Sequence, residues 1–288
     1  MKVILSRKGF DSTYGGYPSP ILPDGRMISL PIPSSIDNVT YSELWMNDNV
    51  TYMEYMKKIS HKIRDGKPVA FDKETRCHLD PDIDCHVLKN RASEWRGCFG
   101  QEGAAQSVLD KRHVDEGDLF LFFGWFHTVS EENGVMSFAR SKGFHAIYGY
   151  LQIDKKYYTA TDMSMPEWVK YHPHMSEERR KRPNNCVYVA KEVTTWDEKI
   201  PGYGCFSFDE KLRLSKRGMS RSKWNLPDCF RGLDIAYHSG NSWKEDYFQS
   251  ACRGQEFVIE ENDAVSTWAM DLVNSHWQRR FLDLLLNE

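Results

Sequence analysis

The sequence has no large excess of charge of one sign. Its 38 Lys and Arg residues are set against 41 Asp and Glu residues, so the formal net charge is −3 at neutral pH. This balance excludes a basic nucleic-acid coat protein and an acidic tail protein. Hydrophobic residues make up 40% and aromatic residues 13% of the chain, enough for a substantial core, which excludes a mainly disordered protein.

Long hydrophobic runs and a regular cysteine framework are also lacking. No run of about 18 apolar residues is present, so the sequence predicts no transmembrane helix and no membrane partner. The first residues turn charged at Arg7 after only a few apolar positions and cannot form the core of a signal peptide. The seven cysteines are odd in number and scattered, unlike a disulfide framework. We therefore expect a soluble, globular, cytoplasmic protein.

The common cofactor and nucleophile motifs are missing as well. The chain contains neither a Gly-x-x-x-x-Gly-Lys-Ser/Thr phosphate loop nor a Gly-x-Gly-x-x-Gly turn after a strand. It also has no Gly-x-Ser-x-Gly elbow, no His-Glu-x-x-His helix and no Cys-x-x-Cys pair. The sequence therefore predicts no cofactor, and it favours hydrolysis, which needs only a positioned water molecule and a base.

The pattern of elements predicts a mixed α+β fold. A chain of 288 residues corresponds to one large domain or two small ones, and no Pro-, Gly- or Ser-rich linker divides it. We therefore expect one domain over residues 1–288, with a central, largely antiparallel sheet flanked by helices. The strands are predicted at residues 2–6, 27–32, 118–126, 144–153, 186–190 and 256–260, with 118–126 and 144–153 paired across a polar loop.

Helices are predicted in three places. A short helix fits residues 103–109, and the segment 37–62 reads as helical in part, whereas 171–185 reads as an exposed loop or short helix. A C-terminal helix over about 263–286 follows a cap at Asn262 or Asp263. Its apolar stripe, which would pack on the rest of the domain, consists of Val265, Trp268, Ala269, Leu272 and Val273.

The acidic turn at residues 77–86 is the first candidate for chemistry. In an extended segment Asp80, Asp82 and Asp84 would project to one side, with His78 among them. Close like charges raise a carboxylate pKa toward that of a general acid or base. The alternative is a solvated loop whose acids cap helices. A zinc site through Cys77, Cys85, His86 and Cys98 matches no common spacing, so no metal is predicted, although whether Cys77, His78 and Cys85 ever hold one stays open.

A second candidate is Asp11, which follows a predicted strand in a glycine-rich turn. Its carboxylate could activate water or stabilise the cation that forms as a glycosidic bond breaks, with Arg7 and Lys8 contacting phosphates. The alternative is that Asp11 caps its own turn through nearby backbone amides.

The segment 211–224 is the strongest basic stretch in this net acidic chain. It carries six basic residues and no acid in 14 positions. Arg213, Arg217, Arg221 and Lys223, together with Trp224, are candidates for phosphate contact and for base or sugar stacking. The alternative is an ordinary solvated face.

A base pocket is the fourth candidate. Arg253, Gln255 and Glu256 can read the donor and acceptor edges of a base, and Gln101 is similar in kind. The aromatic residues Trp125, Tyr148 and Trp224 could stack on that base. The alternatives are a helix-to-strand turn around Gly254 and an aromatic strand that belongs to the core.

Five segments together resemble the third nucleotide-modification-associated domain family, over about residues 3 to 260. They are Ser6–Ser12 (SRKGFDS), His78–Asp82 (HLDPD), Gly117–Trp125 (GDLFLFFGW), His172–His174 (HPH) and Arg253–Phe257 (RGQEF). Only Cys98 departs from the expected pattern, which has a smaller residue there. The resemblance implies a protein of phage DNA modification or bacterial defence that handles modified nucleobases, without specifying the reaction. Residues 104–153 are also similar in pattern to PUA- and EVE-type readers of modified bases.

Two functions follow from these patterns. The first is an enzyme that acts on a flipped-out, modified base in DNA, with N-glycosidic hydrolysis of the DNA-glycosylase type favoured over group transfer onto the base. Its catalytic residues would be Asp11 or the group of His78, Asp80 and Asp82. The second is a reader that binds the modified base without chemistry. Both predict DNA with modified bases, or a modified nucleotide, as the partner.

Overall fold

The computed structural model describes residues 1–60, 71–132, 135–139 and 143–285. Its main feature is a ten-stranded, mostly antiparallel sheet, so the predicted α+β class is confirmed for the described part of the chain. The central path runs β16-β1-β9-β11-β12-β8. These strands are β16 (Glu256–Ile259), β1 (Val3–Arg7), β9 (Leu119–Glu132), β11 (Phe144–Tyr158), β12 (Cys186–Ala190) and β8 (Cys98–Gln101).

The pairings along this path are antiparallel except between β1 and β9. Four further strands join beside it, namely β2 (Ser19–Ile21), β6 (Ile59–Ser60), β10 (Val135–Phe138) and β13 (Tyr203–Cys205). Three small sheets pair β3 (Ile32–Pro33) with β7 (Cys77–His78), β4 (Trp45–Asn47) with β5 (Val50–Thr51), and β14 (Lys223–Trp224) with β15 (Phe248–Gln249).

The first part of the central strand β9, residues 119–124, is buried on both faces. Phe120 and Phe122 stack on one face with ring centroids 5.8 Å apart, and Phe99 of β8 contacts both rings. On the other face Phe123 meets Trp224 edge-on at 5.0 Å. Because β-branched and aromatic side chains fill a pleated surface well, this aromatic run forms a core strand.

The sheet is strongly curved, because its two ends come together. β8 and β16 lie at opposite ends of the strand order. Nevertheless, the Gln101 side chain at the end of β8 donates a hydrogen bond to Glu256 Oε1 at the start of β16, at 2.6 Å. The curvature brings segments that are more than 150 residues apart in sequence onto one side of the molecule.

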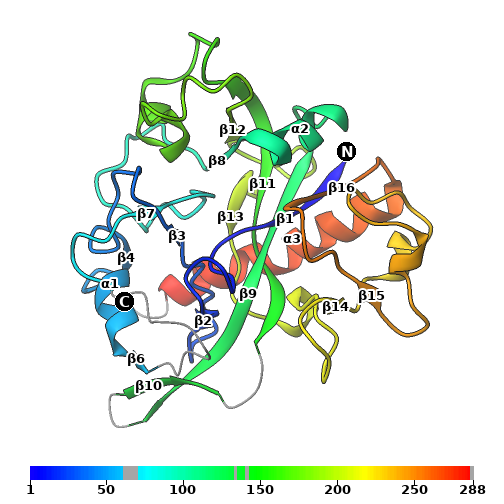
Figure 1. Ribbon diagram of the computed structural model, residues 1–288, viewed down its shortest axis with the longest axis horizontal. Helices are drawn as coiled ribbons and strands as arrows, with labels where there is room; N and C mark the ends of the chain where they lie inside the picture. Colours follow the sequence, from blue (N-terminus) through cyan, green and yellow to red (C-terminus); the bar gives the residue numbers. More distant parts are fainter. Residues whose placement is uncertain (61–70, 133–134, 140–142, 286–288) are drawn as a thin grey trace.

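Helices lie outside this sheet. They are α1 (Tyr52–Lys58), α2 (Gly103–Lys111) and α3 (Asp263–Leu285), with 3₁₀ turns η1 (Glu167–Tyr171), η2 (Pro173–Met175), η3 (Glu210–Leu212), η4 (Asp228–Phe230) and η5 (Gly240–Ser242). Figure 1 shows α3 crossing behind β1 and β13, where Val265, Ala269, Leu272 and Val273 are buried as the stripe predicts. The Asn262 side chain accepts the amide of Val265, which confirms the predicted cap. No helix in the described residues combines the length and apolar composition that a membrane span requires.

Several local predictions need correction. Residues 27–32 form only an isolated bridge at Met27 and the start of β3. In the predicted loop, residues 128–132 continue β9 and 135–138 form β10, which pairs with it. In the described part of 37–62, residues 37–60, only Tyr52–Lys58 form a helix, and a complete capping box between Thr51 and Glu54 marks its start. Residues 61 and 62 lie outside the described residues. The segment 171–185 is not simply exposed, since His172 and His174 are buried.

Candidate functional site

Asp80 lies among three imidazole rings. The Gly100 amide donates a hydrogen bond to Asp80 Oδ1 at 2.8 Å, and His172 Nε2 lies 3.3 Å from the same oxygen. His78 Nε2 and His174 Nε2 each lie 3.8 Å from Asp80 Oδ2. The Asp80 side chain is only 4% exposed. The histidines come from β7 and the turn η2, about 95 residues apart in the sequence.

A second layer of residues orients two of these rings. His78 Nδ1 lies 2.9 Å from Asp37 Oδ2, and Arg179 binds the other oxygen of Asp37. His174 Nδ1 lies 2.5 Å from the side-chain oxygen of Asn185, which is fully buried. Both Nδ1 atoms are thus held by oxygen acceptors, so each ring directs Nε2 toward Asp80.

The environment keeps the acids ionised. Burial alone would raise the pKa of the Asp80 carboxyl, but the hydrogen bond from His172 and the charges of the neighbouring imidazoles outweigh it and hold that pKa well below its usual value. Burial acts in the same way on Asp37, where the interactions with His78 prevail and lower the pKa to about 2. For His174, burial lowers the pKa to about 3. The cluster therefore combines carboxylates with at least one neutral imidazole near neutral pH.

Asp82 lies close in sequence but belongs to a different interaction. Its two oxygens accept hydrogen bonds from Arg91 at 2.6 and 2.8 Å, and its backbone pairs with that of Cys98. Burial raises the pKa of this carboxyl, and the Arg91 guanidinium opposes that rise. The bidentate pair leaves Asp82 engaged in a buried salt bridge rather than facing the imidazoles.

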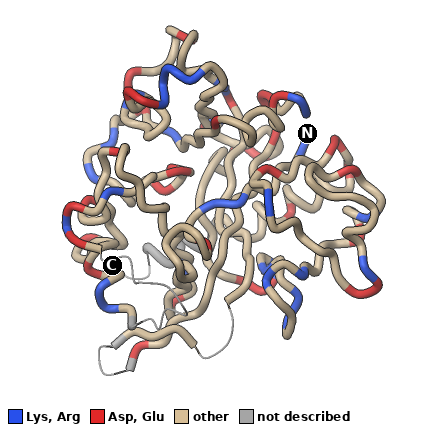
Figure 2. The backbone as a smooth tube through the Cα atoms, viewed as in Figure 1, with Lys and Arg blue, Asp and Glu red and all other residues tan. Residues whose placement is uncertain are grey.

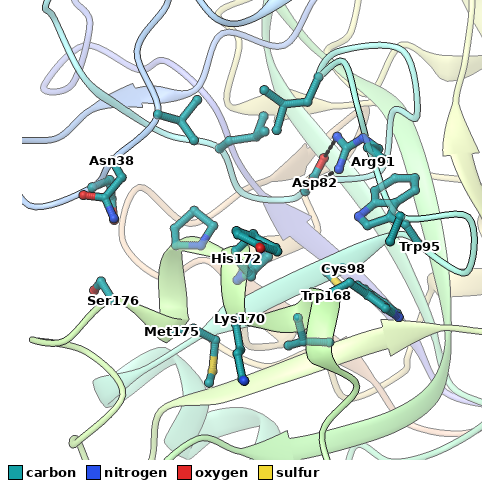
Figure 3. Close-up of a pocket in the computed structure, with 18 of the residues that line it drawn as sticks. Asn38, Asp82, Arg91, Trp95, Cys98, Trp168, Lys170, His172, Met175 and Ser176 are labelled. Atoms are coloured by element: carbon teal, nitrogen blue, oxygen red, sulfur yellow. Dashed lines mark hydrogen bonds and ion pairs between the residues drawn. The ribbon is translucent and has the colours of Figure 1, made fainter.

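A cavity of about 500 Å³ lies beside the Asp80 cluster. Figure 3 shows His172 near its centre, Asn38 and Ser176 at one side, and the Asp82–Arg91 pair at the other. Trp95 and Trp168 contribute aromatic walls, and the Arg91 guanidinium lies 3.8 Å from the centre of the Trp95 ring. Volume and lining match an ordinary small-molecule site, which is mostly apolar with a few convergent polar groups.

Asp11 lies in a separate cluster with two arginines. Asp11 Oδ1 accepts hydrogen bonds from the amides of Thr13 and Tyr14 at 2.6 and 2.7 Å, so this acid caps its own turn. Arg221 lies 4.1 Å over the ring of Trp125. Arg7 donates to backbone carbonyls at residues 251 and 252. In the described part of the chain, no hydrogen bond, ion pair or ring contact joins Asp11 to the turn at 78–82.

Residues of the predicted base pocket also meet. Gln101 Nε2 donates to Glu256 Oε1 at 2.6 Å and lies 3.3 Å from Gln255 Oε1. Lys8 completes this group through a buried salt bridge to Glu256 at 2.8 Å, and its ammonium lies 4.4 Å over the ring of Phe99. The structure thus brings together three segments that the sequence singled out separately, although Arg253 is exposed to solvent beside them.

The sequence of this chain matches a known protein family. The model of the family described as nucleotide modification associated domain 3 matches residues 2–260. The chain belongs to this family. Neither a curated protein nor a solved structure matches it. The family description indicates a role in nucleotide modification, and the resemblance inferred from the five segments is confirmed.

The basic stretch of this nucleotide modification associated domain 3 protein is partly neutralised. Arg213 and Arg217 both pair with Glu210, and Arg213 also stacks on Phe144 at 3.6 Å. Lys223 lies 4.6 Å over the ring of Tyr247. Figure 2 shows Lys and Arg residues gathered in the segment that leads into β14, with acidic residues distributed along the rest of the chain. Arg221 is the member of this stretch that reaches the Asp11 cluster, through its contact with Ser12.

Two of the predicted stacking residues are core residues. Trp224 is 0% exposed, and its indole donates to His145 Nδ1 at 3.1 Å. Tyr148 is likewise buried, against Phe122 and Phe126. Neither ring has free surface on which a base could stack, whereas Trp125 is only partly buried.

Sequence reasoning missed several residues of the site. Asp37, Trp95 and Trp168 carry no local signal, because each acts only through neighbours that folding brings from elsewhere. His172 and His174 had a signal in the His-Pro-His segment. The segment is predicted as an exposed loop or short helix, because its charged continuation dominates the composition. The short helical turn η2 is present, but both histidines are buried.

Proposed function

We propose that this protein is an enzyme that acts on a modified nucleobase, and that the cluster of Asp80 with His78, His172 and His174 is its catalytic group. The observation that carries the proposal is an ionised carboxylate buried among imidazoles beside a cavity with aromatic walls. Strongly perturbed ionisable groups next to a cavity are typical of active sites. The family description supplies the substrate class.

The favoured reaction is hydrolysis of the N-glycosidic bond. As the bond between base and sugar breaks, positive charge develops on the sugar, and a fixed carboxylate such as Asp80 stabilises it. The imidazoles hold the attacking water. Its oxygen forms the new bond to the sugar carbon, and its proton finally resides on the departing base. Transfer of a group onto the base is the next reaction class.

The cavity would bind the extruded base. A base inside a duplex must be turned out before chemistry can reach it, at a cost of a few kcal/mol, and stacking in a pocket offsets that cost. Trp95 and Trp168 of the cavity lining provide the aromatic side chains. Lys89 and Lys170 also line the cavity, and to contact a phosphate they would exchange their present partners, the Trp45 ring and Glu167.

Incubation with hypermodified phage DNA tests the proposal. We expect release of free base, detected by mass spectrometry, and abasic sites in the DNA, detected with an aldehyde-reactive probe. The Asp80→Asn variant should bind the same DNA without releasing base, while Arg217→Met, altered at an exposed side chain, should behave as wild type. Unchanged DNA for every modification tried would contradict hydrolysis.

A reader of modified bases is the second candidate. The convergence of Gln101, Gln255 and Glu256 favours it, because amide and carboxylate groups recognise base edges. A reader would retain its function in cells when Asp80 is replaced by Asn and lose it when Gln101 is replaced. The enzyme predicts the opposite order of severity.

A further inference from the structure

Three potential metal-ligating atoms converge within the Asp80 cluster. His78 Nε2, Asp80 Oδ2 and His174 Nε2 all lie within 4.8 Å of one another, and each nitrogen is 3.8 Å from the carboxylate oxygen. This separation is too long for a hydrogen bond. It is close to the spacing of about 3 to 4 Å that results when ligands lie roughly 2.0–2.2 Å from one shared ion.

The hydrogen bonds at Nδ1 of His78 and His174 determine whether the Nε2 atom that faces Asp80 carries a hydrogen. The amide nitrogen of Asn185 donates to Thr159 and to the His174 carbonyl, both at 2.7 Å, so its side-chain oxygen must accept from His174 Nδ1. In the same way the Asp37 carboxylate accepts from His78 Nδ1. In the neutral rings the Nε2 lone pairs therefore point toward the carboxylate.

The three atoms leave room for one ion between them. Among the described residues none donates a hydrogen bond to Asp80 Oδ2, and the two ring nitrogens approach it from separate segments at a distance longer than a hydrogen bond. With both rings in the neutral form, one divalent cation contacts all three atoms at once, whereas one proton joins only one pair.

We propose that His78, Asp80 and His174 bind one divalent transition-metal ion, through Nε2, Oδ2 and Nε2. Two imidazoles and one carboxylate form a ligand set that Zn²⁺ and Fe²⁺ use in catalytic sites, where positions stay open for water or substrate. Asp37 and Asn185 are the positioning residues that orient the two rings. His172 Nε2 lies 3.3 Å from the other carboxylate oxygen, and it carries the ring hydrogen because Nδ1 accepts from the His174 amide.

The site deepens the proposed function and, as a catalytic site, rests on it: with the ion bound, Asp80 and the two imidazoles act as its ligands, and the ion replaces them in activating the water. A bound metal ion lowers the pKa of its water and supplies hydroxide near neutral pH, which is the nucleophile that hydrolysis requires. A second group of metal-ligating side chains, Asp84, Cys85 and His86, lies nearby in sequence. Its Cys85 and His86 side chains are exposed to solvent, so this second group could also bind an added metal ion, and the test has to distinguish the two groups.

Cobalt binding tests the site directly. Metal-free protein is titrated with Co²⁺, whose visible absorption reports the coordination of the ion, and Zn²⁺ is then added as a competitor. We expect saturation at about one equivalent, and displacement by Zn²⁺. His78→Gln and His174→Gln should abolish the signal, and Asp37→Asn should weaken binding about 10- to 100-fold because the ring loses its orienting carboxylate. Circular dichroism of each variant checks that it is folded.

The matched control is His86→Gln, which should bind Co²⁺ as wild type does. Loss of binding in this variant, or undiminished binding in His78→Gln and His174→Gln, would overturn the proposed site, as would no binding by the folded wild-type protein. Metal binding is measured without DNA. Stoichiometric binding without base release would therefore contradict the hydrolase and leave the metal site standing.

Discussion

Asp80 and Asp11 are two acids with similar sequence signals and different environments. Each lies in a turn that contains Gly or Pro, and the sequence offers the two as alternative catalytic acids. Asp80 is buried among His78, His172 and His174, whereas Asp11 is partly exposed and caps the following turn. The comparison shows that an acid in a turn becomes a chemical group only when folding surrounds it with partners from distant segments.

Histidines in the two regions differ in the same way. His174 faces the Asp80 carboxylate, whereas His145 lies near Arg7 and Arg221 and accepts a hydrogen bond from Trp224. Burial lowers the pKa of both rings, but near Asp80 the carboxylate counteracts that effect and near the arginines the positive charges add to it. The Asp80 region thus suits a cation, and the Arg7–Arg221 region suits an anion.

The largest expected effect separates the two acids. Asp80→Asn should reduce the rate of base release about 10²- to 10⁴-fold, because the charge is lost while the amide oxygen still accepts from Gly100. Asp11→Asn should stay within a few-fold of wild type. Single-turnover kinetics on modified DNA measure both. A larger loss of rate in Asp11→Asn than in Asp80→Asn would make Asp11 the catalytic acid in place of Asp80.

Asp82 provides the next comparison, within one turn. Asp82→Asn should lower the free energy of unfolding by about 3–5 kcal/mol, because it leaves the Arg91 guanidinium buried without its charge partner. Urea denaturation measures this difference. Asp234→Asn is the control: its ion pair with Arg112 is at the surface, with the Asp234 side chain 60% exposed, and should contribute at most about 1 kcal/mol. Equal losses of unfolding free energy in Asp82→Asn and Asp234→Asn would contradict a stabilising role of the buried Asp82–Arg91 pair.

His145 makes stability depend on pH. Its pKa is well below 6.5 in the folded protein, owing to burial and the nearby arginines, so below about pH 6.5 only the unfolded chain binds the proton. The contribution is fully present above that pH and declines by up to about 1.4 kcal/mol per pH unit as the pH falls. His145→Asn keeps an acceptor for Trp224 and should flatten the pH dependence measured by urea denaturation between pH 7 and 5. If the free energy of unfolding of His145→Asn depended on pH as steeply as that of the wild type, His145 would not be the source of the pH dependence.

Arg221 should show the smallest effect. Arg221→Met removes a guanidinium that lies over Trp125, and we expect DNA affinity to fall several-fold, with the slope of log affinity against log salt smaller by about 0.7–0.9. Fluorescence anisotropy at several salt concentrations measures both. Arg217→Met is the matched control, since that guanidinium pairs with Glu210 and is 74% exposed. If only Arg217→Met lowered the DNA affinity, Arg217 and not Arg221 would be the residue that contacts phosphate.

Much of the framework could be predicted from local pattern. The aromatic run at 118–126 and its partner at 144–153 are strands because side chains that fill a pleated surface were concentrated there. The stripe from Val265 to Val273 predicted the packing helix, because its period matches one helical face. Short elements without such a pattern, at 27–32 and 37–51, could not be predicted, since tertiary contacts decide their conformation.

The sequence by itself determined the class of fold, the family and the acids and histidines available for chemistry, because composition, periodicity and ordered motifs are properties of the chain. Only the tertiary structure decided which acid acquired partners. The turn η2 and its first flanking residue bring His174 and His172 to Asp80, while Asp11 remains with its own turn. The reason is physical: burial and distance to opposite charge set the state of an ionisable group, and neither is encoded at that residue alone.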